Sequence, residues 1–187
     1  MKLPADLPAP VDDGACRHLA GVSLPRLSLR STQGREVSLR DESLRRTAVV
    51  FAYPRTGVPG RPTPADWDAI PGARGCTPQA CAFRDLHAEF AAHGATVFGL
   101  STQSPSHQQE MAQRLHLPFE VLSDHEFRLQ KALRLPTFAY HGERLLRRVT
   151  LVVRRGRIVN VFYPVFPTDQ NAAQVLGWLE RPAPGAA

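Results

Sequence analysis

The sequence contains few cysteines, few lysines and no long apolar run. Its 187 residues include three cysteines, too few for a disulfide framework, so we expect a reducing compartment, the cytoplasm. The first twenty residues carry prolines and acids instead of an apolar stretch, which is not the pattern of a secretory signal. No segment approaches the ~20 apolar residues that span a bilayer, so we expect no membrane partner.

Positive charge is carried almost entirely by arginine. The net charge is +6, and only Lys2 and Lys131 are lysines among 23 basic residues. The arginines occur as scattered pairs and form neither a basic helix face nor a stripe interleaved with aromatic residues. We therefore expect no nucleic-acid partner and attribute the charge to overall composition.

The order of apolar segments predicts one α/β domain. Apolar runs alternate with segments of helical periodicity, which indicates a central mixed β-sheet flanked by helices, and a thioredoxin-like fold satisfies this order. We expect an extended N-terminal segment over 1–22, the domain over 23–181, opened by a hairpin, and a flexible tail over 182–187. The expected strands are 24–29, 36–39, 47–53, 95–100, 119–122, 148–153 and 157–163, and the expected helices are 75–90, 106–115, 124–133 and one from about 168 to 181.

A long insertion precedes the cysteine-bearing helix. Residues 55–75 contain four prolines and four glycines. This density argues against any regular element, so we predict a long loop that is functional or mobile. Trp67 and Ile70 are its expected anchors to the body of the domain.

The segment 75–90, GCTPQACAFRDLHAEF, is the centre of the predicted chemistry. Thr77 is the expected N-cap and Pro78 the first helical residue, followed by apolar residues at helical spacing. Cys76 therefore lies at a helix start, where unpaired N–H groups and the helix dipole favour a thiolate. The alternative for Cys76 is a buried structural cysteine.

A second cysteine, Cys81, stands five residues after Cys76. In an unbroken helix their Cα atoms would be roughly 8.6 Å apart, which is beyond the reach of a disulfide. The spacing therefore fits a redox cycle in which Cys76 is oxidised, the first turns unwind and Cys81 attacks.

Other uses of the cysteines are less well supported. Zinc would require Cys76, Cys81, His87 and His93 to converge, but on one helix they point in different directions. We therefore expect no metal. Cys16 lies in a segment expected to be flexible, with no evident partner, and is either incidental or an accessory thiol.

Several strings resemble the active-site region of peroxiredoxins of the atypical two-cysteine, bacterioferritin-comigratory (Q-type) group. The strings are Tyr53-Pro54, residues 75–81 (GCTPQAC), Phe83-Arg84-Asp85, residues 99–102 (GLST), residues 122–124 (LSD), residues 148–151 (RVTL) and Val161-Phe162. The similarity extends from about residue 23 to 180. The resemblance implies a peroxidatic Cys76, a resolving Cys81, an Arg148 that holds the thiolate and the peroxide, and a Pro54 that shields the site. Arg147 is the weaker candidate for the arginine.

One departure from this family pattern concerns the hydroxyl that binds the peroxide. The family has Pro and Thr seven and three residues before the reactive cysteine, where this chain has Ala69 and Ala73. Pro54 suits the family's proline, separated from Cys76 by the insertion. The hydroxyl then comes from elsewhere, with Thr56 the candidate, or is missing.

The resulting hypothesis is a thiol-dependent peroxidase for hydrogen peroxide and organic hydroperoxides, recycled by thioredoxin or a similar dithiol. Thiolate attack on an O–O bond requires no metal or organic cofactor. The alternative is a non-catalytic redox sensor or binding module with the same switchable helix. A disulfide oxidoreductase is disfavoured because Cys-x-x-Cys is absent. We expect a monomer or weak homodimer.

Overall fold

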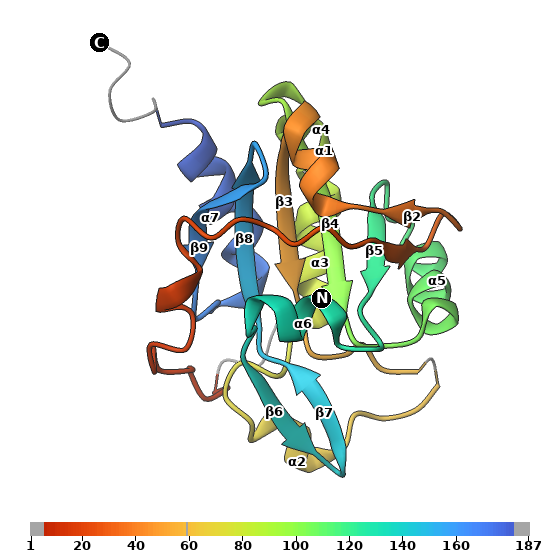
Figure 1. Ribbon diagram of the computed structural model, residues 1–187. Helices are drawn as coiled ribbons and strands as arrows, with labels where there is room; N and C mark the ends of the chain where they lie inside the picture. The colour runs from red at the N-terminus through yellow and green to blue at the C-terminus, as the bar shows by residue number, and fades with distance from the viewer. Residues whose placement is uncertain (1–5, 59, 182–187) are drawn as a thin grey trace.

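The structure is a computed structural model that describes residues 6–58 and 60–181. A seven-stranded sheet runs in the order β2-β1-β5-β4-β3-β8-β9, and a separate hairpin, β6–β7, lies below it (Figure 1). The strands are β1 (Leu29–Ser31), β2 (Glu36–Val37), β3 (Thr47–Ala52), β4 (Ala95–Ser101), β5 (Glu120–Ser123), β6 (Thr137–Tyr140), β7 (Glu143–Leu146), β8 (Val149–Arg154) and β9 (Arg157–Phe162). The helices are α1 (Leu39–Arg45), α2 (Ala65–Asp68), α3 (Cys76–Asp85), α4 (His87–Ala92), α5 (Pro105–Arg114), α6 (Arg128–Leu133) and α7 (Asn171–Leu179), with 3-10 turns η1 (Arg17–Leu19) and η2 (Thr168–Gln170).

The central strand β3 packs against α3, the helix that carries Cys76 and Cys81. β3 pairs in parallel with β4 and antiparallel with β8, so the sheet is mixed. Its Phe51 ring stacks on Phe83 of α3, with ring centroids 4.5 Å apart and planes 7° from parallel. A Cβ at Gly99 on β4 would come within 3.2 Å of Phe51, so glycine is required for this packing.

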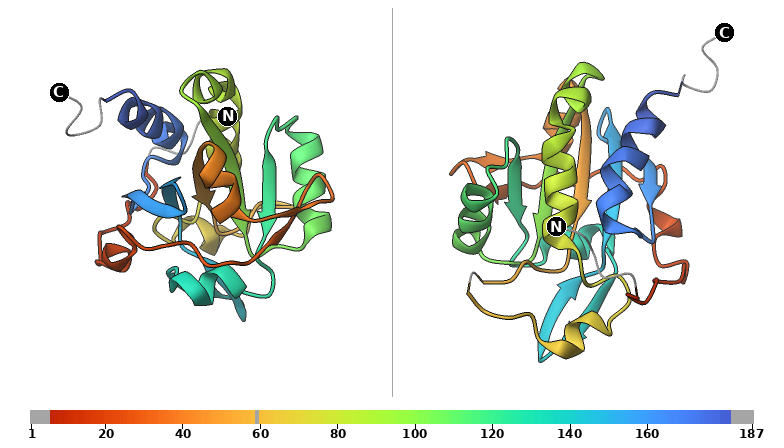
Figure 2. Two further views of the ribbon diagram at one scale, coloured as in Figure 1. Left: turned by 45° about the horizontal axis from the view of Figure 1, so that its top comes forward. Right: turned by 180° about the vertical axis from the view of Figure 1, so that it is seen from behind.

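Helices cover both faces of the sheet. α3 and α7 lie side by side on one face, and Phe83 and Val175 contribute to that core (Figure 2). The other face is covered by α1, α6 and the N-terminal part of the chain, with Leu19, Leu39 and Leu133 buried against it. These layers confirm the predicted thioredoxin-like fold with a central mixed sheet flanked by helices.

The helix that carries the cysteines differs from the prediction at both ends. Its N-cap is Gly75 in a left-handed conformation (φ +102°), and Thr77 makes no cap. The helix also breaks at Leu86 (φ −103°, ψ 16°), so residues 75–90 form α3 and α4. Glycine tolerates the positive φ without strain, and the helix starts two residues earlier than a cap at Thr77 would allow.

The insertion contains regular structure that its proline and glycine content did not predict. A short helix, α2, places Trp67 against Tyr140 of the β6–β7 hairpin, with ring centroids 4.8 Å apart. Ile70 packs against the same cluster, as expected. Neither this hairpin nor α1 was predicted.

The N-terminal segment is packed, not merely extended. Cys16 is 5% exposed and Leu19 is fully buried in the core, which corrects the expectation that Cys16 lies in a flexible segment. Ser23 forms a β-bridge with Arg157 of β9. The expected tail, 182–187, lies outside the described residues. Among the helices of the described residues, none is both long and apolar enough to cross a membrane.

Candidate active site

Cys76 is the first residue of α3, beneath the end of β3, and its side chain is only 5% exposed. Its Sγ lies 3.7 Å from the carbonyl oxygen of Ala73, to which it is a weak donor. Buried Tyr53, which follows β3, lies close enough for the Cys76 charge to act on its hydroxyl, and burial raises the pKa of Tyr53 well above its usual range. The sulfur thus lies in a largely water-excluded site.

Arg148 lies immediately before β8 and donates from Nη2 to the Cys76 Sγ at 3.2 Å. The arginine is 4% exposed, yet within the described chain no carboxylate forms an ion pair with it. A buried guanidinium without a counter-charge is costly. The Cys76 sulfur therefore lies next to a buried positive charge that no carboxylate neutralises.

Arg148 also fixes the loop before the helix. Its Nε donates to the carbonyl oxygen of Gly72 at 3.3 Å, and Nη2, which also contacts the sulfur, donates to the carbonyl oxygens of Ala73 at 3.1 Å and Arg74 at 3.4 Å. The planar fork of the guanidinium therefore holds three successive carbonyls and the sulfur together. The end of the insertion and the reactive thiol are positioned by one side chain.

A chain of hydrogen bonds between buried polar side chains begins at Arg148. Arg148 Nη1 donates to Gln79 Oε1, and Gln79 Nε2 donates to Asn171 Oδ1 at 2.9 Å. Thr150 donates its hydroxyl to the same Asn171 oxygen at 2.7 Å. No role was assigned to these three residues from the sequence. Gln79 and Thr150 nevertheless lie within two of the strings that carry the resemblance, residues 75–81 and 148–151.

Cys81 lies on the same continuous helix as Cys76, partly exposed, and both are free thiols. The helix is unbroken between them, so the helical estimate of roughly 8.6 Å between their Cα atoms applies. Oxidation to a disulfide therefore requires the first turns of α3 to unwind. In the part of the chain described, no group of three or more His, Cys, Asp or Glu side chains is arranged to hold a metal.

The third cysteine has a different environment. Burial, with a smaller contribution from the charges of Asp13 and Asp12, raises the pKa of the Cys16 thiol to about 12. Cys16 is therefore almost entirely protonated at neutral pH and is a poor nucleophile.

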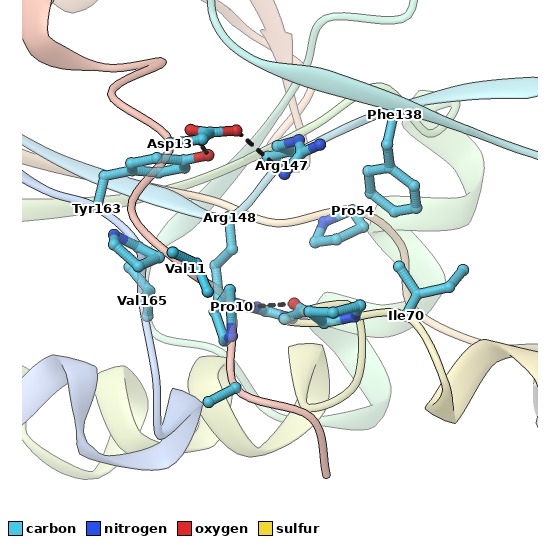
Figure 3. A pocket seen from close by; sticks show the side chains of 14 residues that line it. Pro10, Val11, Asp13, Pro54, Ile70, Phe138, Arg147, Arg148, Tyr163 and Val165 are labelled. Carbon is cyan, nitrogen blue, oxygen red and sulfur yellow. Dashed lines mark hydrogen bonds and ion pairs between the residues drawn. The ribbon is translucent and has the colours of Figure 1, made fainter.

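A pocket of about 370 Å³ opens beside Arg148 (Figure 3). Pro54, which is buried, forms part of its wall, and Arg147 also faces it. Cys76 itself does not line the pocket; Arg148 lies between the pocket and the sulfur. The structure thus brings Pro54, Arg148 and Cys76 to one locality.

Thr56 is not part of this locality. Its side chain lines a second hollow, where the hydroxyl contacts Gln103 Oε1 at 3.3 Å and His107 Nε2 at 3.2 Å. The chain turns away after Pro54, so Thr56 points toward α5 instead of α3. This position does not support the expectation that Thr56 binds peroxide at Cys76.

Comparison with known proteins places these features in a family. Residues 19–176 match the Redoxin family. A chloroplastic peroxiredoxin Q of Oryza sativa subsp. japonica is 32% identical over 160 residues, which are 86% of this chain and 66% of the rice protein. A putative peroxiredoxin bcp of Coxiella burnetii is 25% identical over 165 residues, 85% of this chain and 97% of that protein.

Solved structures agree with this assignment. The peroxidoxin BcpB of Mycobacterium tuberculosis superposes with a TM-score of 0.70 at 25% identity, over 86% of this chain and 95% of that one. A Xanthomonas campestris peroxiredoxin Q has the same fold, with a TM-score of 0.68. The chain spans slightly less than two thirds of the rice relative's length but nearly all of the bacterial relative's. The chain therefore belongs to the Redoxin family and, within it, to the Q-type, bacterioferritin-comigratory peroxiredoxins.

Proposed function

We propose that this protein is a thiol-dependent peroxidase that reduces hydrogen peroxide and organic hydroperoxides. The observation that carries the proposal is the 3.2 Å contact between Arg148 Nη2 and Cys76 Sγ, in which the buried cation has no carboxylate partner. A buried arginine at this position stabilises the thiolate, which is the nucleophilic form of cysteine. The same guanidinium can donate to a peroxide oxygen as negative charge develops on it.

In the first step, the Cys76 thiolate attacks the terminal oxygen of the hydroperoxide. The S–O bond forms while the O–O bond breaks, and the departing oxygen takes a proton and leaves as water or an alcohol. Cys76 becomes a sulfenic acid, which is the two-electron oxidised state. Pro54 shields the site from bulk water, and Arg148 supplies the N–H donors.

In the second step, the first turns of α3 unwind and the Cys81 thiolate attacks the Cys76 sulfur. The hydroxyl leaves with a proton as water, and an intramolecular disulfide forms. A dithiol donor of the thioredoxin type then reduces the disulfide to two thiols and becomes oxidised itself. The donor, a reducing compartment such as the cytoplasm, and a monomeric or weakly dimeric state are parts of the proposal.

The hydroxyl of the family pattern has no equivalent at Ala73, and Thr56 is taken up by Gln103 and His107. We therefore assign the contacts with peroxide to Arg148. This assignment predicts a working peroxidase whose rate depends unusually strongly on one arginine.

The test is multiple turnover. Reduced protein is mixed with excess dithiothreitol or a thioredoxin system, and hydrogen peroxide is followed over many equivalents. A peroxidase consumes peroxide until the dithiol is exhausted, and Cys76→Ser abolishes the consumption. A redox sensor would consume about one equivalent and stop, which would overturn the proposal.

A further inference from the structure

The outer wall of the pocket comes from a part of the chain that precedes the family match. Ala9, Pro10, Val11 and Asp13 line the pocket, whereas the Redoxin match begins at residue 19. These residues cross in front of Arg148 (Figure 3). We name residues 9–13 the N-terminal wall.

The N-terminal wall rests on the loop that Arg148 holds. Gly72, whose carbonyl accepts from Arg148 Nε at 3.3 Å, has a φ of +75°, and a Cβ built there would lie 3.3 Å from Pro10 Cγ. Pro10 thus packs against the Gly72 backbone. The Pro10 end of the wall therefore contacts the loop that leads to Cys76.

The other end of the N-terminal wall is tied down by Asp13. Its Oδ1 accepts from the Tyr163 hydroxyl at 2.9 Å, and its Oδ2 lies 3.5 Å from Arg147 Nη1. Hydrogen bonds from the Ala15 N–H and Tyr163 lower the pKa of Asp13, so the carboxylate is charged at neutral pH. Buried Cys16 and Leu19 anchor the chain immediately afterwards.

The pocket is apolar apart from charges that already have partners. Across from the N-terminal wall lie Pro54, Ile70 and Phe138. Arg147 is paired with Asp13, and Arg148 is directed to the sulfur and the loop carbonyls. Val11 lines the pocket yet is 81% exposed, among the most exposed large hydrophobic residues of the described chain. An uncharged apolar group bound in the pocket would cover it.

We propose that the N-terminal wall determines substrate preference by binding the organic group of bulky, uncharged hydroperoxides, such as an aryl-alkyl hydroperoxide, against Pro10 and Val11. The inference rests on the proposed function. Hydrogen peroxide has no apolar part and gains nothing from the wall. The preference for an organic over an inorganic peroxide therefore depends on residues outside the family match.

The test compares kcat/KM for cumene hydroperoxide with that for hydrogen peroxide, as a ratio, in the full-length protein. In the double variant Pro10→Gly, Val11→Ser the ratio should fall about tenfold, because one apolar face of the pocket is lost. Asp13→Asn, which weakens the attachment to Tyr163 and Arg147, should lower the ratio about threefold. Asp12→Asn is the matched control, because it removes the same charge within the wall at a residue that does not line the pocket, and the ratio should not change.

A ratio within twofold of the parent protein in the double variant would overturn the proposal, provided circular dichroism shows an unchanged fold. If the double variant does not fold, the kcat/KM ratio of Asp13→Asn decides the question. A ratio unchanged from the parent protein would then overturn the proposal.

A binding measurement separates this proposal from the proposed function. The product alcohol, 2-phenyl-2-propanol, is titrated into the Cys76→Ser protein while the Val11 methyl resonances are followed by NMR. Saturable shifts would show that the alcohol binds at the N-terminal wall, and Pro10→Gly in the same background should weaken the affinity about tenfold. This result would support the proposal even if no peroxide is turned over. The absence of any shift at Val11 would reject the wall even if the protein is an active peroxidase.

Discussion

Arg148 and Cys76 form a buried contact in which a guanidinium N–H is directed at sulfur across 3.2 Å. The two residues are 72 positions apart in the sequence and meet because β8 pairs with β3, beneath which α3 begins. No carboxylate of the described residues competes for the arginine. The contact thus depends on the antiparallel pairing of β3 with β8.

Arg148→Met should slow the reaction of the reduced protein with hydrogen peroxide by about 100-fold, the scale expected when a donor to developing negative charge is removed. The measurement is the second-order rate constant by stopped flow. Arg154→Met is the matched control, because Arg154 is the last residue of β8, the strand that Arg148 immediately precedes, and it packs over Trp178. A similar loss of rate in both variants would attribute the effect to strand stability and not to the contact with sulfur.

Gln79→Leu should lower both the stability of the protein and its rate with peroxide. The substitution removes the oxygen that accepts from Arg148 and the N–H that donates to Asn171, both in a fully buried position. We expect a loss of about 2 kcal/mol in the free energy of unfolding and a rate about tenfold lower. Gln79→Glu keeps an acceptor but gives Arg148 the carboxylate partner that it lacks in the parent, so its rate should also fall about tenfold, because the buried cation is then neutralised. A Gln79→Glu protein that reacts as fast as the parent would show that the missing counter-charge at Arg148 does not matter to the rate.

Cys81→Ser should leave Cys76 as a persistent sulfenic acid after one equivalent of peroxide, and excess peroxide should drive it to the sulfinic acid. In the parent protein, peptide mapping should find a Cys76–Cys81 disulfide, and amide exchange should rise over residues 77–84 while β3 stays protected.

The control for this prediction is Cys16→Ala. The pKa of about 12 leaves Cys16 protonated at neutral pH, so its removal should not alter disulfide formation. A Cys16–Cys76 disulfide in the parent protein would show that the resolving role has been assigned to the wrong residue.

Asp66 should make a pH-dependent contribution to stability through the insertion. Its carboxylate accepts from His141 at 2.6 Å and from the Tyr140 hydroxyl at 2.9 Å, and these bonds hold the pKa of Asp66 below its usual range. A carboxyl whose pKa is lower in the folded state stabilises the fold above its unfolded pKa, and the contribution disappears as pH falls through the folded value.

Asp66→Asn should therefore lower Tm by about 1–3 °C at pH 7, since the pair is exposed. At acid pH, once Asp66 is protonated in both the folded and the unfolded state, the difference between the two proteins should shrink toward zero. Thermal unfolding at both pH values tests this, with Asp68→Asn as a control that leaves the hairpin contact intact. A difference in Tm that grows as the pH falls would reverse the assigned sign.

Much of the sheet could be predicted because its strands have simple patterns. β3 and β4 are continuous apolar runs, and both positions were correct to within one residue. The β6–β7 hairpin was missed because Glu143 and Arg144 make β7 polar, while Tyr140 and Leu145 are buried by Trp67 from the insertion. A hairpin stabilised by a distant segment carries little local signal.

The site was only partly accessible from sequence. Cys76 could be proposed from its place at a helix start and Arg148 from the family resemblance, and the structure places the two in contact. The Gln79–Asn171–Thr150 chain depends on α3, α7 and β8 meeting in space, and periodicity does not reveal such contacts. Thr56 was selected for its hydroxyl and its proximity to Pro54, but the backbone after Pro54 directs that hydroxyl to Gln103.

The central claim is that Arg148 and Cys76 together make a fast-reacting thiolate. The most direct measurement is a single-turnover stopped-flow reaction of the fully reduced protein with hydrogen peroxide, with free cysteine under the same conditions as reference. We predict a second-order rate constant at least about 1,000-fold above that of free cysteine, with the oxidation located at Cys76 by mass spectrometry. A rate constant no greater than that of free cysteine, or oxidation that bypasses Cys76, would contradict the account.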